Sequence, residues 1–215
     1  MHEHSGPQNM LTFDYLTLRK AVGILGVALP FVLAIGKWIT QGPGLQSSMS
    51  CYYYTDMRNY FVGSMCSIGM FLMSCKGYDK WDVVSGRLAC VLSVCVAFFP
   101  TKPSNPTHFR SVIGDMHLAF AGTLFFTLAV MCLVLFTKTT AENRPTRQKL
   151  QRNIVYKACG IIILICVGLC PVVMTDRVCK LLAGLDPVFC LEATAVVSFG
   201  FAWLVKGETI LKDRN

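Results

Sequence analysis

Charged residues are scarce in this sequence. Asp, Glu, Lys and Arg make up 15% of its 215 residues, whereas hydrophobic residues make up 53%. A soluble domain of this length usually carries about 25% charged residues. Because the charges that exist are separated by long apolar runs, the composition argues against a soluble globular domain and indicates an integral membrane protein.

The sequence also lacks a region suited to nucleic acid. Its net charge is +8, but the basic residues lie between apolar segments. No basic domain studded with aromatic residues is present to hold a nucleic acid. We therefore expect membrane lipids as partners and no nucleic acid.

Established enzyme motifs are missing as well. There is no G-x-S-x-G, H-E-x-x-H or P-loop pattern, and the eleven cysteines do not show the C-x-x-C spacing of zinc sites. Asp56, His117 and Glu192 are chemically possible zinc ligands, although their spacing does not single them out. We therefore predict neither a cofactor nor a bound metal, and the sequence leaves open whether the protein is an enzyme.

Six apolar segments have about the 20 residues that a helix needs to cross a bilayer. Pro30 lies inside the first segment, where membrane helices tolerate proline better than soluble helices do. The predicted fold is an all-α integral membrane bundle of six transmembrane helices, forming one domain over residues 1–215. The predicted spans are about 21–40, 59–75, 83–100, 113–137, 156–175 and 187–205.

The distribution of Lys and Arg between the connections predicts the orientation. Fourteen lie on the side that carries both termini, and six lie on the opposite side. Because cytoplasmic loops are enriched in Lys and Arg, both termini are predicted to be cytoplasmic. The strongest signal is the basic connection 138–157.

Polar residues gather at the outer mouths of the predicted helices. The segment Ser50–Gly69 reads SCYYYTDMRNYFVGSMCSIG, with three tyrosines, an aspartate and an arginine before an apolar run. The simplest interpretation of the tyrosines is an aromatic belt at the headgroup level. The other interpretation is a ligand-binding pocket built from Asp56, Arg58, His117, Glu192, Tyr53 and Tyr54.

Glu192 has the most unusual surroundings, because it is an acid with apolar neighbours on both sides in VFCLEATAVV. A lone carboxylate below the interface is driven to protonate or to find a cation. Either a structural ion pair with Arg58 or His117, or a functional role, accounts for it. Asp115 and His117 point to different sides of one helix, and we expect His117 to face the bundle.

These observations predict a multi-pass membrane protein with an outward-facing polar pocket that binds or handles lipid or a small polar ligand. One alternative is a membrane-embedded lipid hydrolase that uses Asp56, His117 and Glu192. Another alternative is a small transporter or channel.

Small residues and cysteines are expected to contribute to packing within the bundle. Gly63 with Ser67, and Gly23 with Gly26, are expected at close helix contacts. Most cysteines lie in apolar segments as small packing residues. Cys51, Cys179 and Cys190 lie on the outer side, and we expect Cys179 and Cys190 to be close enough for a disulfide.

One stretch resembles a known group of membrane proteins. In AFFPTKPSNPTHFRSVIGDMHLAFAGTLFF, a helix ends in Phe99-Pro100, a Pro-rich loop follows, and His117 lies near the start of the next helix. This pattern resembles six-helix membrane proteins that are distantly similar to the damage-regulated autophagy modulator and GPI-anchor lipid-remodelling proteins. The resemblance implies a membrane role in lipid handling, and it carries over no catalytic residue.

Overall fold

The computed structural model describes residues 7–74, 79–103, 105–139, 146–182 and 184–210. Within these ranges, the side chains of residues 7–15, 176, 179 and 180 are outside the description. The described secondary structure is helical throughout. Its elements are α1 (Pro7–Gln41), η1 (Ser50–Tyr54), α2 (Arg58–Ser74), α3 (Lys80–Phe98), α4 (His108–Val130), η2 (Met131–Leu135), α5 (Arg147–Val173), α6 (Asp176–Leu181) and α7 (Pro187–Lys206).

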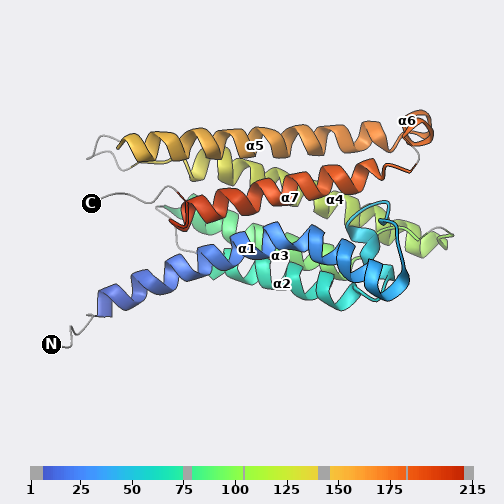
Figure 1. Cartoon of the computed structure of the whole chain (residues 1–215), viewed down its shortest axis with the longest axis horizontal. Coiled ribbons are helices and arrows are strands. Elements are labelled where there is room, and N and C mark those ends of the chain that lie inside the picture. The colour runs from blue at the N-terminus through green and yellow to red at the C-terminus, as the bar shows by residue number, and fades with distance from the viewer. Residues whose placement is uncertain (1–6, 75–78, 104, 140–145, 183, 211–215) are drawn as a thin grey trace.

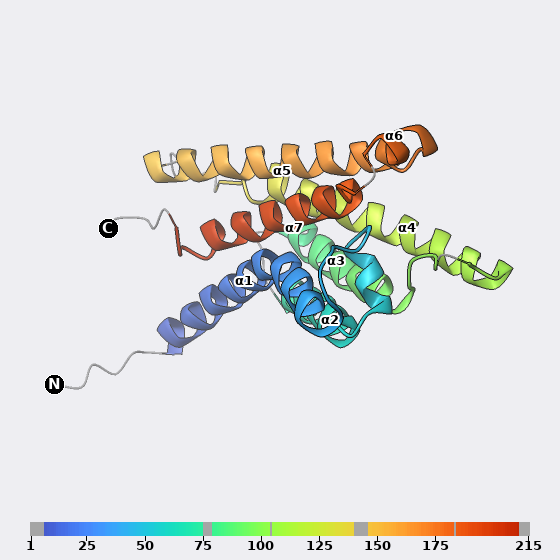
Figure 2. The same cartoon turned by 45° about the vertical axis from the view of Figure 1, so that its right-hand side comes forward.

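The six long helices form a ring. Each packs on its neighbours in the order α1, α2, α3, α4, α5, α7 and back to α1, whereas α4 and α7 hardly touch across the ring. Figures 1 and 2 show the helices running roughly along one axis, with the start of α1 and the end of α7 toward the same end. We call this the Lys206 end, and the opposite end, which carries η1 and α6, the η1 end.

Five described helical stretches are long and apolar enough to cross a membrane. The stretches are Leu16–Gln41, Lys80–Phe98, His108–Leu135, Arg147–Val173 and Pro187–Lys206. These agree with five of the predicted spans. The remaining predicted span, 59–75, corresponds to α2, which has 17 residues and packs in the same ring; its crossing stays a prediction.

Large apolar side chains cover the outside of the ring. Trp38 and Ile39 on α1 are 63% and 78% exposed, and Ile154 on α5 is 68% exposed. In water, such a broad apolar surface promotes association. Hydrocarbon solvates it without penalty, which supports the membrane assignment.

The fifth helix begins nine residues before the predicted start of its span. Thr146 caps it by accepting a hydrogen bond from the Lys149 amide, so α5 starts at Arg147. Part of the predicted basic connection is therefore helical. This places Lys149 and Arg152 on a rigid element beside α7 instead of in a flexible loop.

Glycine brings α1 and α7 into close contact. A methyl group on Gly200 would lie 2.7 Å from the Val27 backbone nitrogen and 2.8 Å from the Gly23 carbonyl oxygen. The expected packing role of Gly23 and Gly26 is thus confirmed, with Gly200 as their counterpart. The expectation for Gly63 is wrong, because its Cα faces open space.

The predicted proximity of Cys179 and Cys190 stays a prediction, because one of the two side chains lies outside the description. Cys51 and Cys190 both carry free thiols. The side chain of Cys179 lies outside the description. Short outer loops can bring two cysteines near each other, but bridging also needs their Cβ vectors to converge, which sequence separation does not report.

Candidate functional site

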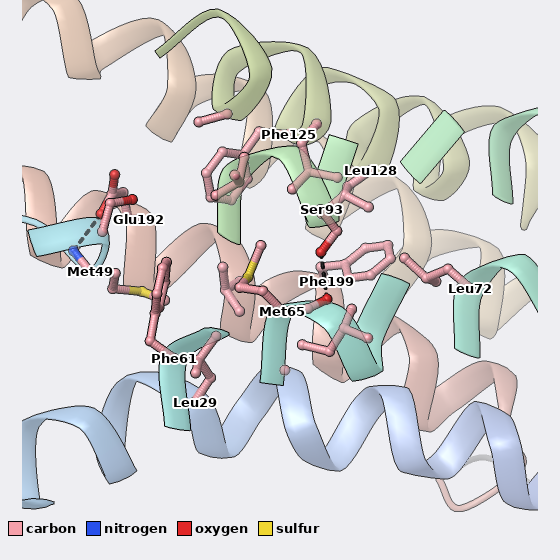
Figure 3. Close-up of a pocket in the computed structure, with 17 residues that line it drawn as sticks. Leu29, Met49, Phe61, Met65, Leu72, Ser93, Phe125, Leu128, Glu192 and Phe199 are labelled. Atoms are coloured by element: carbon pink, nitrogen blue, oxygen red, sulfur yellow. Dashed lines mark hydrogen bonds between the residues drawn. The ribbon is translucent and has the colours of Figure 1, made fainter. Parts of the chain in front are cut away.

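A narrow apolar cavity lies inside the ring. It has a volume of about 50 Å³ and is lined from α1, α2, α3, α4, α7 and the residues around η1. Figure 3 shows Glu192 at one end of the row of lining side chains and Leu72 at the other. The Ser93 hydroxyl inside this space donates to the Met65 carbonyl oxygen at 2.7 Å, so its polarity is satisfied locally.

A side groove of about 360 Å³ lies between α4, α5 and α7. Leu118, Gly122 and Phe125 form its α4 side, and Val167 and Cys170 belong to its α5 side. Its lining is mainly apolar, and Leu118 is 54% exposed. The groove is therefore open at the outer surface of the bundle, where lipid acyl chains surround a membrane protein.

A third space, the mouth, lies at the η1 end and has a volume of about 510 Å³. It is the most polar of the three spaces, with Ser47, Ser48, Lys102, Asp115 and Asp186 among its lining residues. Lys102 Nζ and Asp115 Oδ1 form an ion pair at 2.6 Å. Opposite charges thus stand beside each other in this polar space.

The three spaces share walls. Leu118, Met174 and Val188 line both the mouth and the side groove. Ala121, Phe125 and Glu192 line both the side groove and the inner cavity. The polar mouth therefore adjoins the apolar groove, and Glu192 lies between that groove and the inner cavity.

Glu192 is held by the backbone of a distant segment. Its Oε2 accepts the Met49 amide N–H at 2.6 Å, as the dashed line in Figure 3 shows. The bond satisfies a backbone N–H that would otherwise be buried without an acceptor, since Met49 is 4% exposed. The predicted cation, Arg58 or His117, is replaced in this role by an amide at the start of η1. Sequence reasoning missed Met49, because a backbone donor leaves no signature in residue type.

The three tyrosines have different surroundings. Tyr52 is fully buried, with its ring centroid 5.8 Å from that of Phe189 on α7, so it cannot belong to an interfacial belt. Burial raises the pKa of the Tyr52 hydroxyl above its ordinary value. Tyr52 is therefore a core residue. The tyrosines predicted for the ligand-binding pocket were the next two, Tyr53 and Tyr54.

Tyr53 and Tyr54 lie at the surface of the η1 end. The Arg58 guanidinium donates to the Tyr53 hydroxyl at 2.7 Å and lies 4.3 Å from that ring's centroid. The Tyr54 hydroxyl donates to the Thr101 carbonyl oxygen at 2.6 Å, tying η1 to the α3–α4 connection. Asp56 is exposed, and no ion pair is recorded for it among the described residues.

His117 faces the bundle, as its helical position predicts, and is 4% exposed. Its Nδ1 lies 2.6 Å from the Phe99 carbonyl oxygen at the end of α3. Asp115, two residues earlier, points outward to Lys102. The histidine thus joins α3 to α4 next to the Phe-Pro turn.

The structure gives the predicted site residues separate partners. Glu192 bonds to Met49, His117 to Phe99, and Arg58 to Tyr53. Of the predicted site residues, Glu192 alone lines any of these three spaces: it borders the inner cavity and the side groove, but not the mouth. In the described part of the chain, no group of three His, Cys, Asp or Glu side chains is arranged to hold a metal ion, so the zinc alternative has no geometric basis there.

Comparisons with family models, curated proteins and solved structures returned no match for this chain.

Proposed function

We propose that this membrane protein binds a lipid at the η1 end, with the polar headgroup in the mouth and an acyl chain in the side groove. The observation that carries the proposal is that the mouth and the groove adjoin, with Leu118, Met174 and Val188 lining both. A polar space joined to an apolar groove has the amphipathic pattern of a lipid. The groove also lies among helices long and apolar enough to cross a membrane.

Glu192 gives the inner end of the groove its selectivity. The carboxylate is the acidic group shared by the groove and the cavity, and its Oε2 is engaged by Met49. A hydroxyl or amine of a ligand can donate to a carboxylate that has acceptor sites left over. We propose that Glu192 contacts such a donor near the linkage between headgroup and chain.

The hydrolase and transporter alternatives receive less support. A hydrolase needs Asp56, His117 and Glu192 within reach of one reacting atom, whereas each has surroundings of its own. A transporter needs a polar path to the Lys206 end. Beyond Glu192, the lining of the inner cavity is apolar except for serines, and the Ser93 hydroxyl already donates to the Met65 carbonyl oxygen. Binding is therefore the function that the geometry favours.

Two open glycines provide a matched test. The Cα atoms of Gly122 and Gly168 both face open space, so neither position clashes when a side chain is added. Gly122 lines the groove on α4, and Gly168 on α5 does not. Gly122→Trp fills the groove, and Gly168→Trp adds the same side chain to a lipid-facing surface.

Native mass spectrometry of the full-length protein, purified in mild detergent, counts the phospholipid that stays bound. We expect wild type and Gly168→Trp to retain one phospholipid, and Gly122→Trp to retain at least about fivefold less, because an indole fills space that a chain occupies. Equal retention by the two variants, or no retained phospholipid in wild type, contradicts the proposal.

A further inference from the structure

Four basic side chains converge at the Lys206 end, the opposite end from the proposed lipid groove. Arg19 comes from α1, Lys149 and Arg152 come from α5, and Lys206 ends α7. The charges of Arg19, Lys149, Arg152 and the α3 residue Asp82 all act on the Lys206 ammonium. Three basic side chains and one acid thus lie near the Lys206 ammonium.

These groups are not the solvated surface cations that merely orient a membrane protein. Arg152 is only 9% exposed. Lys206 Nζ lies 4.6 Å from the Phe136 ring centroid, and Lys149 Nζ donates to the Phe136 carbonyl oxygen at 2.9 Å. Lys157, by contrast, is an exposed lysine on the same helix. Holding cations together against an aromatic core costs free energy that an orientation signal does not require.

The local acid is already shared with another cation. Asp82 Oδ2 lies 3.6 Å from Lys138 Nζ, and Lys138 also donates to both carboxylate oxygens of Asp79. Arg19 Nε is buried and has no hydrogen-bond acceptor among the described residues. A donor turned away from water, inside a group of cations, indicates an anionic acceptor.

We propose that Arg19, Arg152 and Lys206 bind a phosphomonoester at this end of the bundle. A phosphomonoester carries close to two negative charges and three strong acceptor oxygens, and arginine forks match such oxygens in pairs. The cluster lies where helices of membrane-spanning length end, which is the depth of lipid headgroups. The site is independent of the proposed groove, since it shares no residue with it.

The test titrates the full-length protein in detergent micelles with dioctanoyl phosphatidic acid, dioctanoyl phosphatidylcholine and inorganic phosphate, followed by calorimetry. Phosphatidic acid carries a phosphomonoester, whereas phosphatidylcholine carries a zwitterionic diester. We expect phosphatidic acid to bind at least about tenfold more tightly than phosphatidylcholine, the size of one charge-assisted hydrogen bond. Equal binding of the two lipids overturns the proposal.

Variants separate a built site from general basicity. Arg19→Gln and Arg152→Gln are each expected to weaken phosphatidic acid binding about tenfold, and the matched control Lys157→Gln less than about twofold. An equal loss in Lys157→Gln overturns the proposal. If the buried Arg152 variant does not fold, Arg19→Gln against Lys157→Gln decides the question. Displacement of phosphatidic acid by millimolar inorganic phosphate supports a free phosphate ligand, and resistance to it supports a lipid headgroup.

Discussion

Glu192 Oε2 and the Met49 amide nitrogen lie 2.6 Å apart, joining residues separated by 143 positions in the chain. This bond fastens the segment before η1 onto the second turn of α7. It also fixes the carboxylate at the junction of the side groove and the inner cavity. One residue thus fastens the η1 end and presents a carboxyl group to the proposed lipid site.

Substitutions of Glu192 test how much its hydrogen bond with Met49 contributes to the stability of the fold. In Glu192→Ala, the Met49 N–H loses its partner, which costs about 1–3 kcal/mol when the donor stays buried. Glu192→Gln keeps an acceptor oxygen, so we expect it to lose about 1 kcal/mol or less. Thermal unfolding in detergent measures both variants, and an alanine variant as stable as the glutamine variant contradicts the structural role of this bond.

The buried tyrosine predicts a contrast between adjacent residues. Tyr52 is fully buried, whereas Tyr54 is 48% exposed. Tyr52→Ala opens a cavity beside Phe189, and we expect it to cost about 3–5 kcal/mol. Tyr54→Ala removes one exposed hydrogen bond and is expected to cost about 1 kcal/mol. Denaturant titration of both variants compares them, and similar losses argue against a core position for Tyr52.

The contact between α1 and α7 predicts a second contrast. A Cβ at Gly200 meets backbone atoms of α1 that cannot rotate away. We therefore expect Gly200→Ala to destabilise the protein by about 1–3 kcal/mol through overpacking. Gly168→Ala faces open space on α5, and the better helix propensity of alanine should stabilise it by up to about 1 kcal/mol. Unfolding temperatures measured side by side check the sign of each change.

The Asp79–Lys138 ion pair predicts a dependence on pH. The Lys138 hydrogen bond holds the pKa of the Asp79 carboxyl below its ordinary value of 3.8. Because the pKa of Asp79 is lower in the folded state than in the unfolded state, its carboxylate contributes fully to folding stability above the unfolded pKa. That contribution disappears as pH falls through the folded pKa. Wild type should therefore be more stable than Asp79→Asn at neutral pH, and the difference should shrink as pH falls past 3.8 and vanish below the folded pKa of Asp79.

Asparagine suits this comparison because it also caps helices, so the variant keeps the cap of α3 and removes only the charge. Unfolding temperatures of wild type and Asp79→Asn across this pH range provide the measurement. A difference that stays constant down to the lowest pH shows that the charge of Asp79 contributes nothing.

The membrane topology is open to a direct test. Reporter insertions after Lys76 and after Pro103 should lie on opposite sides, with the Lys76 site cytoplasmic, because Lys and Arg concentrate on the side of the termini. Insertions on the same side contradict a crossing by α3. An insertion after Leu45 that reports the same side as Lys76 shows that α2 does not cross.

The all-helical membrane class was predictable from the sequence, and so were the bounds of α2, α3 and α7 to within three residues and the inward position of His117, whereas α1 begins well before its predicted span. These properties depend on the length of apolar runs and on helical spacing, which are local. The early start of α5 was missed because polar, basic residues continue a helix as readily as they form a loop. Whether Cys179 and Cys190 can bridge was likewise not predictable, because a disulfide depends on the relative direction of two side chains.

The partner of Glu192 was decided by tertiary structure alone. From residue types, a buried carboxylate calls for a cation, and Arg58 and His117 were the candidates. In the folded chain, a backbone amide at Met49 satisfies the carboxylate instead, Arg58 lies on Tyr53, and His117 bonds to Phe99. Every residue except proline offers such an amide. Which backbone amide reaches Glu192 therefore depends on how the helices pack into the ring, and amino-acid composition does not determine that packing.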